Sequence, residues 1–203
     1  MRRLSSIEQT RMMYRTIALI FASLLALWGC GGGDSAASLP GSRAPVLNAS
    51  FDQVSATGAL VSWQASEHNQ GKSYTFQADS NGAWSAPSSA KIHRYGPEDY
   101  GLLSQLIQIQ LAWINKTARL TAQLKTEGAV DTGAALTLQM IGSRGEILAW
   151  NHMNDARVTQ SQGWKSYSID LKTLPGTTSI AVGVMLEGSG TLWADDIKLE
   201  IID

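Results

Sequence analysis

Strict alternation of apolar and polar side chains is the feature that most constrains the fold of this 203-residue chain. Every second residue is apolar in the segments 119–125 and 135–140. Successive side chains of a β-strand point to opposite faces, so such alternation predicts half-buried strands. Six further segments show the pattern, namely 59–64, 73–78, 105–111, 165–171, 179–186 and 191–201.

Turn-forming Gly, Asn and Pro separate these segments, and no stretch after residue 46 keeps a helical period over three turns. Eight to ten short strands joined by regular turns indicate an all-β fold, either an antiparallel sandwich or a barrel. We favour an antiparallel jelly-roll β-sandwich.

The N-terminal segment differs in character from the rest of the chain. Basic residues up to Arg15 precede an apolar run over 17–28, and Gly29 then precedes Cys30, the only cysteine. This order is typical of a secretory signal. The run of about 12 residues is shorter than the roughly 20 that a membrane-spanning helix needs, which argues against an uncleaved anchor.

Residues 27–30 (Leu-Trp-Gly-Cys) resemble the lipobox of bacterial lipoproteins. The resemblance implies a cleaved signal peptide over 1–29 and membrane anchoring through a lipidated Cys30. Residues 30–45 are rich in Gly, Ser and Pro and predict a flexible tether to a single domain over 46–203. Gly31, rather than an aspartate, follows the cysteine, and by analogy with retention signals this favours the outer membrane of a bacterial envelope.

The charge of the remaining chain restricts its partners. Residues 1–29 hold four of the 16 Lys and Arg and one of the 17 Asp and Glu, so 12 bases face 16 acids, a net charge of −4. Nucleic-acid partners are disfavoured, because phosphate binding usually needs a basic surface. Without a second cysteine the domain has no internal disulfide, and packing or a metal must stabilise it.

Both ends of the domain resemble one family. Residues 47–52 (Leu-Asn-Ala-Ser-Phe-Asp) resemble the opening strand of CenC-type carbohydrate-binding modules, and 188–199 resemble their closing strand, where an aromatic residue precedes paired aspartates. The resemblance implies a galactose-binding-like jelly roll, a fold that serves both glycan-binding and non-binding modules.

The closing strand also suggests a metal site. If 191–201 is a regular strand, Trp193 and Asp195 share the apolar core face, and a buried carboxylate needs a partner. The resemblance implies a structural calcium ion held by Asp52 with Asp195 or Asp196. Calcium takes about six to eight oxygen ligands. Alternatively, Asp195 lies in a bulge or accepts N–H groups from a turn.

Amide side chains suggest a ligand surface. Alternation places several glutamines opposite the core on strands that we expect to be neighbours, and amides match sugar hydroxyls as donors and acceptors. These residues are Gln108, Gln110, Gln123 and Gln139. The alternative is an ordinary solvated face of an antiparallel sheet.

Two tryptophans suit stacking on a sugar ring. Trp84 follows a turn, and Trp150 precedes a polar run that includes Asn154, so both indoles are expected to be exposed; packing within a loop is the alternative. The other tryptophans of the domain lie in or beside apolar strands and are expected in the core. They are Trp63, Trp113, Trp164 and Trp193.

Catalytic motifs are not recognisable. The three histidines form no closely spaced pair, and the sequence contains no nucleophile elbow and no phosphate-binding glycine loop. We therefore expect a non-catalytic, lipid-anchored envelope protein that binds glycan. The alternatives are a structural or protein-interaction module that binds an envelope protein, and a hydrolase acting on an envelope polymer.

Overall fold

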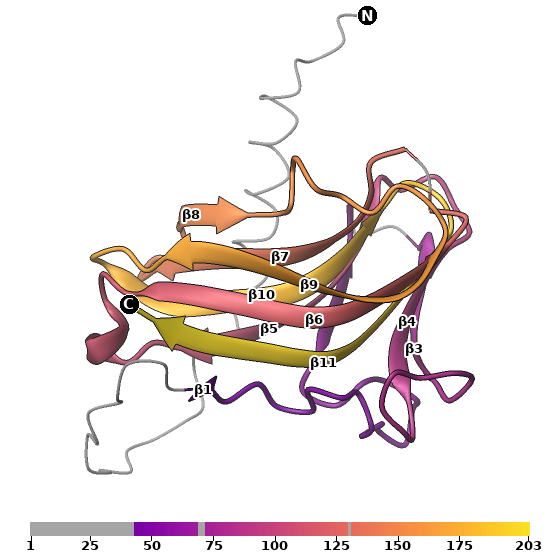
Figure 1. Ribbon diagram of the computed structural model, residues 1–203, viewed down its shortest axis with the longest axis horizontal. Coiled ribbons are helices and arrows are strands. Elements are labelled where there is room, and N and C mark those ends of the chain that lie inside the picture. The colour runs from indigo at the N-terminus through magenta and orange to yellow at the C-terminus, as the bar shows by residue number, and fades with distance from the viewer. Residues whose placement is uncertain (1–42, 69–71, 130) are drawn as a thin grey trace, which may run out of the picture.

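A computed structural model describes residues 43–68, 72–129 and 131–203, which form the β-sandwich in Figure 1. The predicted signal peptide, Cys30 and the tether up to residue 42 lie outside the described residues. In the ranges that the structure describes, no helix is long and apolar enough to cross a membrane.

One layer, called here the front sheet, contains β6, β9 and β11, which lie in front in Figure 1. Its strand order is β3-β4-β11-β6-β9, and β1 also pairs with β11. Its antiparallel strands are β1 (Arg43–Ala44), β3 (Tyr74–Asp79), β4 (Ser89–Arg94), β6 (Thr117–Glu127), β9 (Gln162–Lys172) and β11 (Thr191–Ile202).

The other layer, the back sheet, has the strand order β2-β5-β10-β7-β8 and is also antiparallel. Its strands are β2 (Gln64–Glu67), β5 (Tyr100–Gln108), β7 (Gly133–Gly142), β8 (Ile147–Asn151) and β10 (Thr177–Glu187). A short 3-10 helix over Leu111–Trp113 links β5 to β6. The chain changes sheets repeatedly, which gives the predicted antiparallel jelly-roll sandwich.

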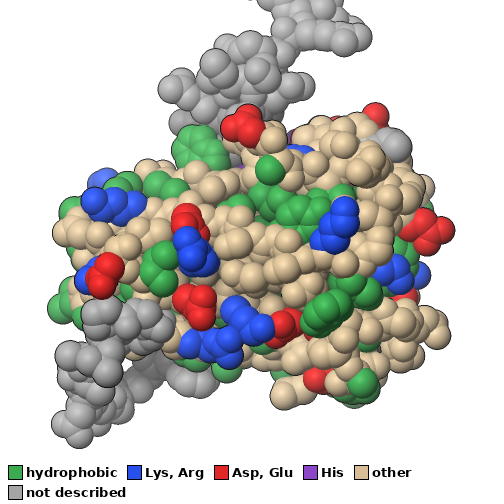
Figure 2. Space-filling view, in the orientation of Figure 1, with side chains coloured by type: hydrophobic (Ala, Val, Ile, Leu, Met, Phe, Trp, Pro, Cys, Tyr) green, Lys and Arg blue, Asp and Glu red, His purple; other side chains and the backbone are tan. Residues whose placement is uncertain are grey.

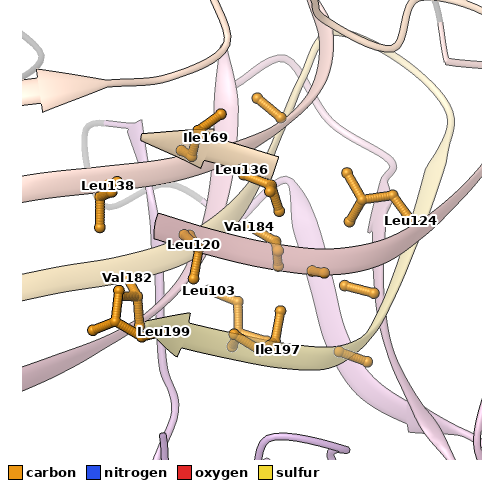
Figure 3. Close-up of a cluster of buried hydrophobic side chains, with 14 of the residues drawn as sticks. Leu103, Leu120, Leu124, Leu136, Leu138, Ile169, Val182, Val184, Ile197 and Leu199 are labelled. Carbon is orange, nitrogen blue, oxygen red and sulfur yellow. The ribbon is translucent and has the colours of Figure 1, made fainter. Parts of the chain in front are cut away.

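Apolar side chains fill the space between the sheets, as Figure 3 shows. Leu136 of β7 and Leu120 of β6 are both 0% exposed. Burying such a side chain contributes about 1.5–3 kcal/mol, so packing between the sheets accounts for stability without a disulfide. The labelled core residues are Leu103, Leu120, Leu124, Leu136, Leu138, Ile169, Val182, Val184, Ile197 and Leu199.

The strand prediction was wrong at several places. Residues 59–63 form a turn and loop rather than a strand, because Leu60 and Trp63, three residues apart, both pack into the core. Strands β4 and β8 were not predicted. Residues 43–44, placed in the tether, form β1, where Ala44 is 1% exposed and pairs with Leu199.

Candidate functional site

Two of the predicted ligand residues are direct neighbours on the outer surface of the back sheet. Gln139 of β7 lies opposite Trp150 of β8 in the strand register, and Ala181 of β10 lies on the other side of Gln139. Trp150 is 42% exposed, as predicted, and lies on the edge strand β8. We call the surface around Gln139, Trp150 and His152 the back-sheet face.

The amide of Gln139 is only partly satisfied. Its Nε2 lies 3.0 Å from Nε2 of His152, and both side chains are buried. Among the residues that the structure describes, no donor reaches its Oε1. An unsatisfied buried polar group costs about 1–3 kcal/mol. Because this oxygen is itself buried, a ligand could donate to it only if the Gln139 side chain turned toward the surface.

The imidazole on this face is uncharged at neutral pH. Burial, helped by the positive charge of Arg157, lowers the pKa of His152 to about 3. Arg157 itself pairs with Glu187 at 2.7 Å. An amide, a neutral imidazole and a half-exposed indole suit hydrogen bonding and stacking rather than proton transfer.

The predicted glutamine surface is divided between the two sheets. Gln108 lies on the back sheet, paired with Ser179, whereas Gln123 lies on β6 of the front sheet. Gln110 is exposed at the start of the 3-10 helix. The prediction that these strands are neighbours was wrong, because β5, β6 and β7 alternate between the sheets.

The remaining predicted ligand residues lie in loops. Trp84 is 52% exposed, as expected, but it lies in the loop between β3 and β4 of the front sheet. Asn154 is exposed in the loop between β8 and β9, four residues after Trp150. Trp150 and Gln139 therefore form the centre of the candidate site, and Trp84 belongs to another part of the molecule.

The closing strand β11 is interrupted by a bulge. Asp196 has a φ of 51°, and the register with β6 shifts between Asp195 and Lys198. A bulge adds one residue to one strand and reverses the faces beyond it. Trp193 and Asp195 therefore lie on the outer surface, and the prediction that they share the core face with Ile197 was wrong.

Asp195 is nevertheless fully buried, because the β3–β4 loop covers it. Ser85 donates its N–H to Oδ2 (2.8 Å) and its hydroxyl to Oδ1 (2.9 Å), and the Asp196 N–H also donates to Oδ1 (2.7 Å). Burial raises the pKa of Asp195, and the charge of Asp52 raises it further. The alternative prediction for Asp195, a bulge whose carboxylate accepts backbone N–H groups, is therefore confirmed.

Two of the three predicted calcium ligands, Asp52 and Asp195, lie near each other. Asp52 and Asp195 are close enough to repel each other, which a divalent cation would relieve. Asp196 pairs instead with Lys198. Within the described residues, no three His, Cys, Asp or Glu side chains are placed to hold one ion. An ion here would rely on Asp52, Asp195 and backbone or water oxygens.

A polar arrangement around Trp193 was not predicted from the sequence. This indole is 6% exposed on the outer surface of the front sheet, and its Nε1 donates to Oδ2 of Asp79 at 2.8 Å. Lys91 and Lys125 lie on either side of Trp193 in the sheet. The Nζ atom of Lys91 is 5.2 Å from the centroid of the indole ring, and that of Lys125 is 4.4 Å from it. These cation–π contacts bury a tryptophan outside the core.

Comparison with known proteins assigns no family. No known family model matches the sequence. The uncharacterized HTH-type transcriptional regulator YbfP of Bacillus subtilis (strain 168) is 28% identical over 108 residues, which are 52% of this chain and 36% of the regulator. The chain thus spans about a third of that relative's length.

Solved structures resemble the whole sandwich. The CBM22-1 xylan-binding domain of Paenibacillus barcinonensis Xyn10C has a TM-score of 0.58 at 12% identity, covering 82% of this chain and 99% of that domain. A CBM4 structure has a TM-score of 0.51 at 11% identity, covering 77% and 99%.

The enzymatically active domain of tailspike protein 4 from bacteriophage CBA120 has a TM-score of 0.59 at 12% identity. The match covers 77% of this chain but only 21% of that one. These likenesses establish a carbohydrate-binding-module-like jelly-roll fold, and at such low identity they establish the fold alone.

Proposed function

We propose that this protein is a non-catalytic glycan-binding module whose ligand lies on the back-sheet face. One observation carries the proposal: Gln139, with an unsatisfied buried acceptor, is the cross-strand partner of the half-exposed Trp150. A sugar ring can pack against the exposed indole, and a hydroxyl can donate to the amide oxygen once the Gln139 side chain turns toward the ligand. The fold shared with xylan-binding and other carbohydrate-binding modules supports this ligand class.

The proposed location is the bacterial envelope, with the domain anchored in the outer membrane through a lipidated Cys30. The basic n-region, the short apolar run and the lipobox-like residues before Cys30 support this. A flexible tether over residues 31–42, ahead of β1, would have a root-mean-square reach of roughly 20 Å, which would hold the domain close to the bilayer.

A structural calcium ion between Asp52 and Asp195 belongs to the same proposal. Calcium at a hundred times its dissociation constant would stabilise the fold by about 2.7 kcal/mol. Thermal melts with calcium and with chelator test this. Asp195→Asn should abolish the calcium-dependent rise in melting temperature, whereas Asp196→Asn should keep it. If the wild type melts at the same temperature with and without calcium, the proposal of a structural calcium ion is wrong.

The ligand is tested by a glycan-array screen of the full-length protein, with and without calcium. Trp150→Ala and Gln139→Ala should each weaken a positive interaction at least about tenfold, or 1.4 kcal/mol. Trp84→Ala is the matched control, since that exposed indole lies on the front-sheet side. Silence across the array would favour the protein-interaction alternative, and loss only in Trp84→Ala would place the ligand elsewhere.

A further inference from the structure

A depression lies on the opposite outer surface of the sandwich, on the front sheet. It has a volume of about 450 Å³, within the roughly 300–1,000 Å³ of ligand pockets. Strands β3, β4, β11 and β6 supply two rows of side chains in register. The first row is Gln77, Lys91, Trp193 and Lys125, and the second is Thr75, His93, Thr191 and Glu127.

All of these residues except Lys125 line the depression, together with Gly128 and Gly190. We call it the front-sheet hollow. Figure 2 shows the front sheet's side of the molecule, where basic side chains lie beside hydrophobic ones.

The floor of the hollow is rigid. Trp193 is fixed by its hydrogen bond to Asp79 and by the two lysines that bracket its ring. Asp79 also pairs with Lys91 at 3.6 Å, and the hydrogen bond from Trp193 holds the pKa of this carboxyl below its usual range. A fixed floor lowers the entropic cost of binding.

The walls offer both donors and acceptors. The Lys91 ammonium has three N–H donors, so its contact with Asp79 leaves others for a ligand. Nδ1 of His93 lies 2.9 Å from the Thr191 hydroxyl oxygen, which fixes the imidazole. Glu127 is exposed at the other end of the second row. In the described part of the chain, its carboxylate has no Lys, Arg or His partner within 4.0 Å.

We propose that the front-sheet hollow is a second binding site, for a neutral sugar residue recognised through adjacent hydroxyl groups. Two hydroxyls donate to the Glu127 carboxylate, and a third accepts from the Lys91 ammonium, with Gln77 completing the contacts. Charged acceptors make hydrogen bonds of roughly twice the strength of neutral ones, which suits a carboxylate facing two hydroxyls. The protein would then hold glycan on two opposite faces and could bridge chains.

This inference goes beyond the proposed function and does not depend on it, because the two sites share no residue. Isothermal titration calorimetry of the full-length protein with xylotriose, cellotriose and β-1,4-galactotriose tests both sites separately. At least one of the three should bind at two sites per chain. Glu127→Gln, which keeps the shape of the side chain, should remove one site or weaken it about tenfold.

Trp150→Ala should remove the other site. Glu200→Gln is the matched control, since it neutralises a carboxylate on β11 outside the hollow and should leave both sites unchanged. A single site lost in Trp150→Ala and kept in Glu127→Gln would overturn this inference and keep the proposed function. A single site that is lost in Glu127→Gln and kept in Trp150→Ala would support the front-sheet hollow and contradict the proposed site on the back-sheet face. Failure of all three sugars to bind at millimolar concentration would overturn it.

Discussion

Trp193 illustrates how far one residue's role depends on its neighbours. Its position on the strand directs the indole toward solvent, yet Lys91, Lys125 and Asp79 cover it. The sequence predicted a buried tryptophan here correctly but on the wrong face. The bulge at Asp196 reverses the alternation. Aspartate adopts positive φ more readily than most residues, so a bulge can form here without a glycine that would mark it in the sequence.

Replacing Trp193 should destabilise the fold in spite of its place outside the core. Trp193→Ala removes the packing against two lysine side chains and one hydrogen bond, and we expect a loss of about 3 kcal/mol in the free energy of unfolding. Trp84→Ala, at an exposed indole, should cost less than about 0.5 kcal/mol. Urea denaturation compares them, and equal losses would contradict the burial described here.

The buried His152 should make stability depend on pH. Its folded pKa is about 3 and its ordinary value is 6.5, so between these values the unfolded chain binds a proton that the folded protein does not. The free energy of unfolding should therefore fall by up to about 1.4 kcal/mol for each pH unit below 6.5, and this contribution should be constant above it.

Urea denaturation at several pH values checks this slope. His152→Gln should flatten it, and His93→Gln, at an exposed imidazole, is the control. A wild-type slope that His152→Gln leaves intact would assign the pH dependence to other groups.

At the scale of elements, alternation predicted the long strands well and their partners poorly. Segments 119–125, 135–140, 165–171 and 179–186 all lie within observed strands. Whether a strand joins the front or the back sheet depends on whether the preceding loop crosses between the sheets. Alternation along a strand does not reveal this. For this reason Gln123 and Gln139 were assigned to one surface and lie on two.

The central strand β10 has little tolerance for added volume. A Cβ on Gly183 would lie 2.6 Å from the Leu103 carbonyl oxygen and 2.8 Å from Oγ1 of Thr137. Gly183→Ala should therefore cost about 1–3 kcal/mol through overpacking. Gly163→Ala is the control, since a Cβ there meets nothing within 4 Å. Equal stability of both variants in thermal melts would contradict the close pairing of β5, β10 and β7.

At the scale of the whole molecule, the sequence predicted the fold class and a candidate site in part. Both depended on patterns that can be read from a single sequence. Alternation predicted the sandwich, and a neighbouring turn or polar run predicted that Trp84 and Trp150 are exposed. The pairing of Trp150 with Gln139 and the front-sheet hollow depend on strand register. Register arises from long-range contacts, so neither was visible in the sequence.

The proposed membrane anchoring depends on the N-terminal segment as well as on the folded domain. Cys30→Ala should move the protein from the membrane fraction to the soluble fraction of a bacterial host and abolish incorporation of labelled palmitate, because acylation requires the thiol. The conservative substitution Ser35→Ala, in the predicted tether, should change neither readout. Palmitate incorporation by Cys30→Ala would contradict the assignment of the lipidated residue.

The central claim is that glycan binds the back-sheet face, and an NMR titration of the isotope-labelled protein with a glycan that scores on the array tests it most directly. We predict that the side-chain amide signals of Gln139 and the indole N–H of Trp150 shift together with the same dissociation constant, while the indole N–H of Trp84 stays in place. Saturable binding that leaves the Gln139 and Trp150 signals unmoved would contradict the account.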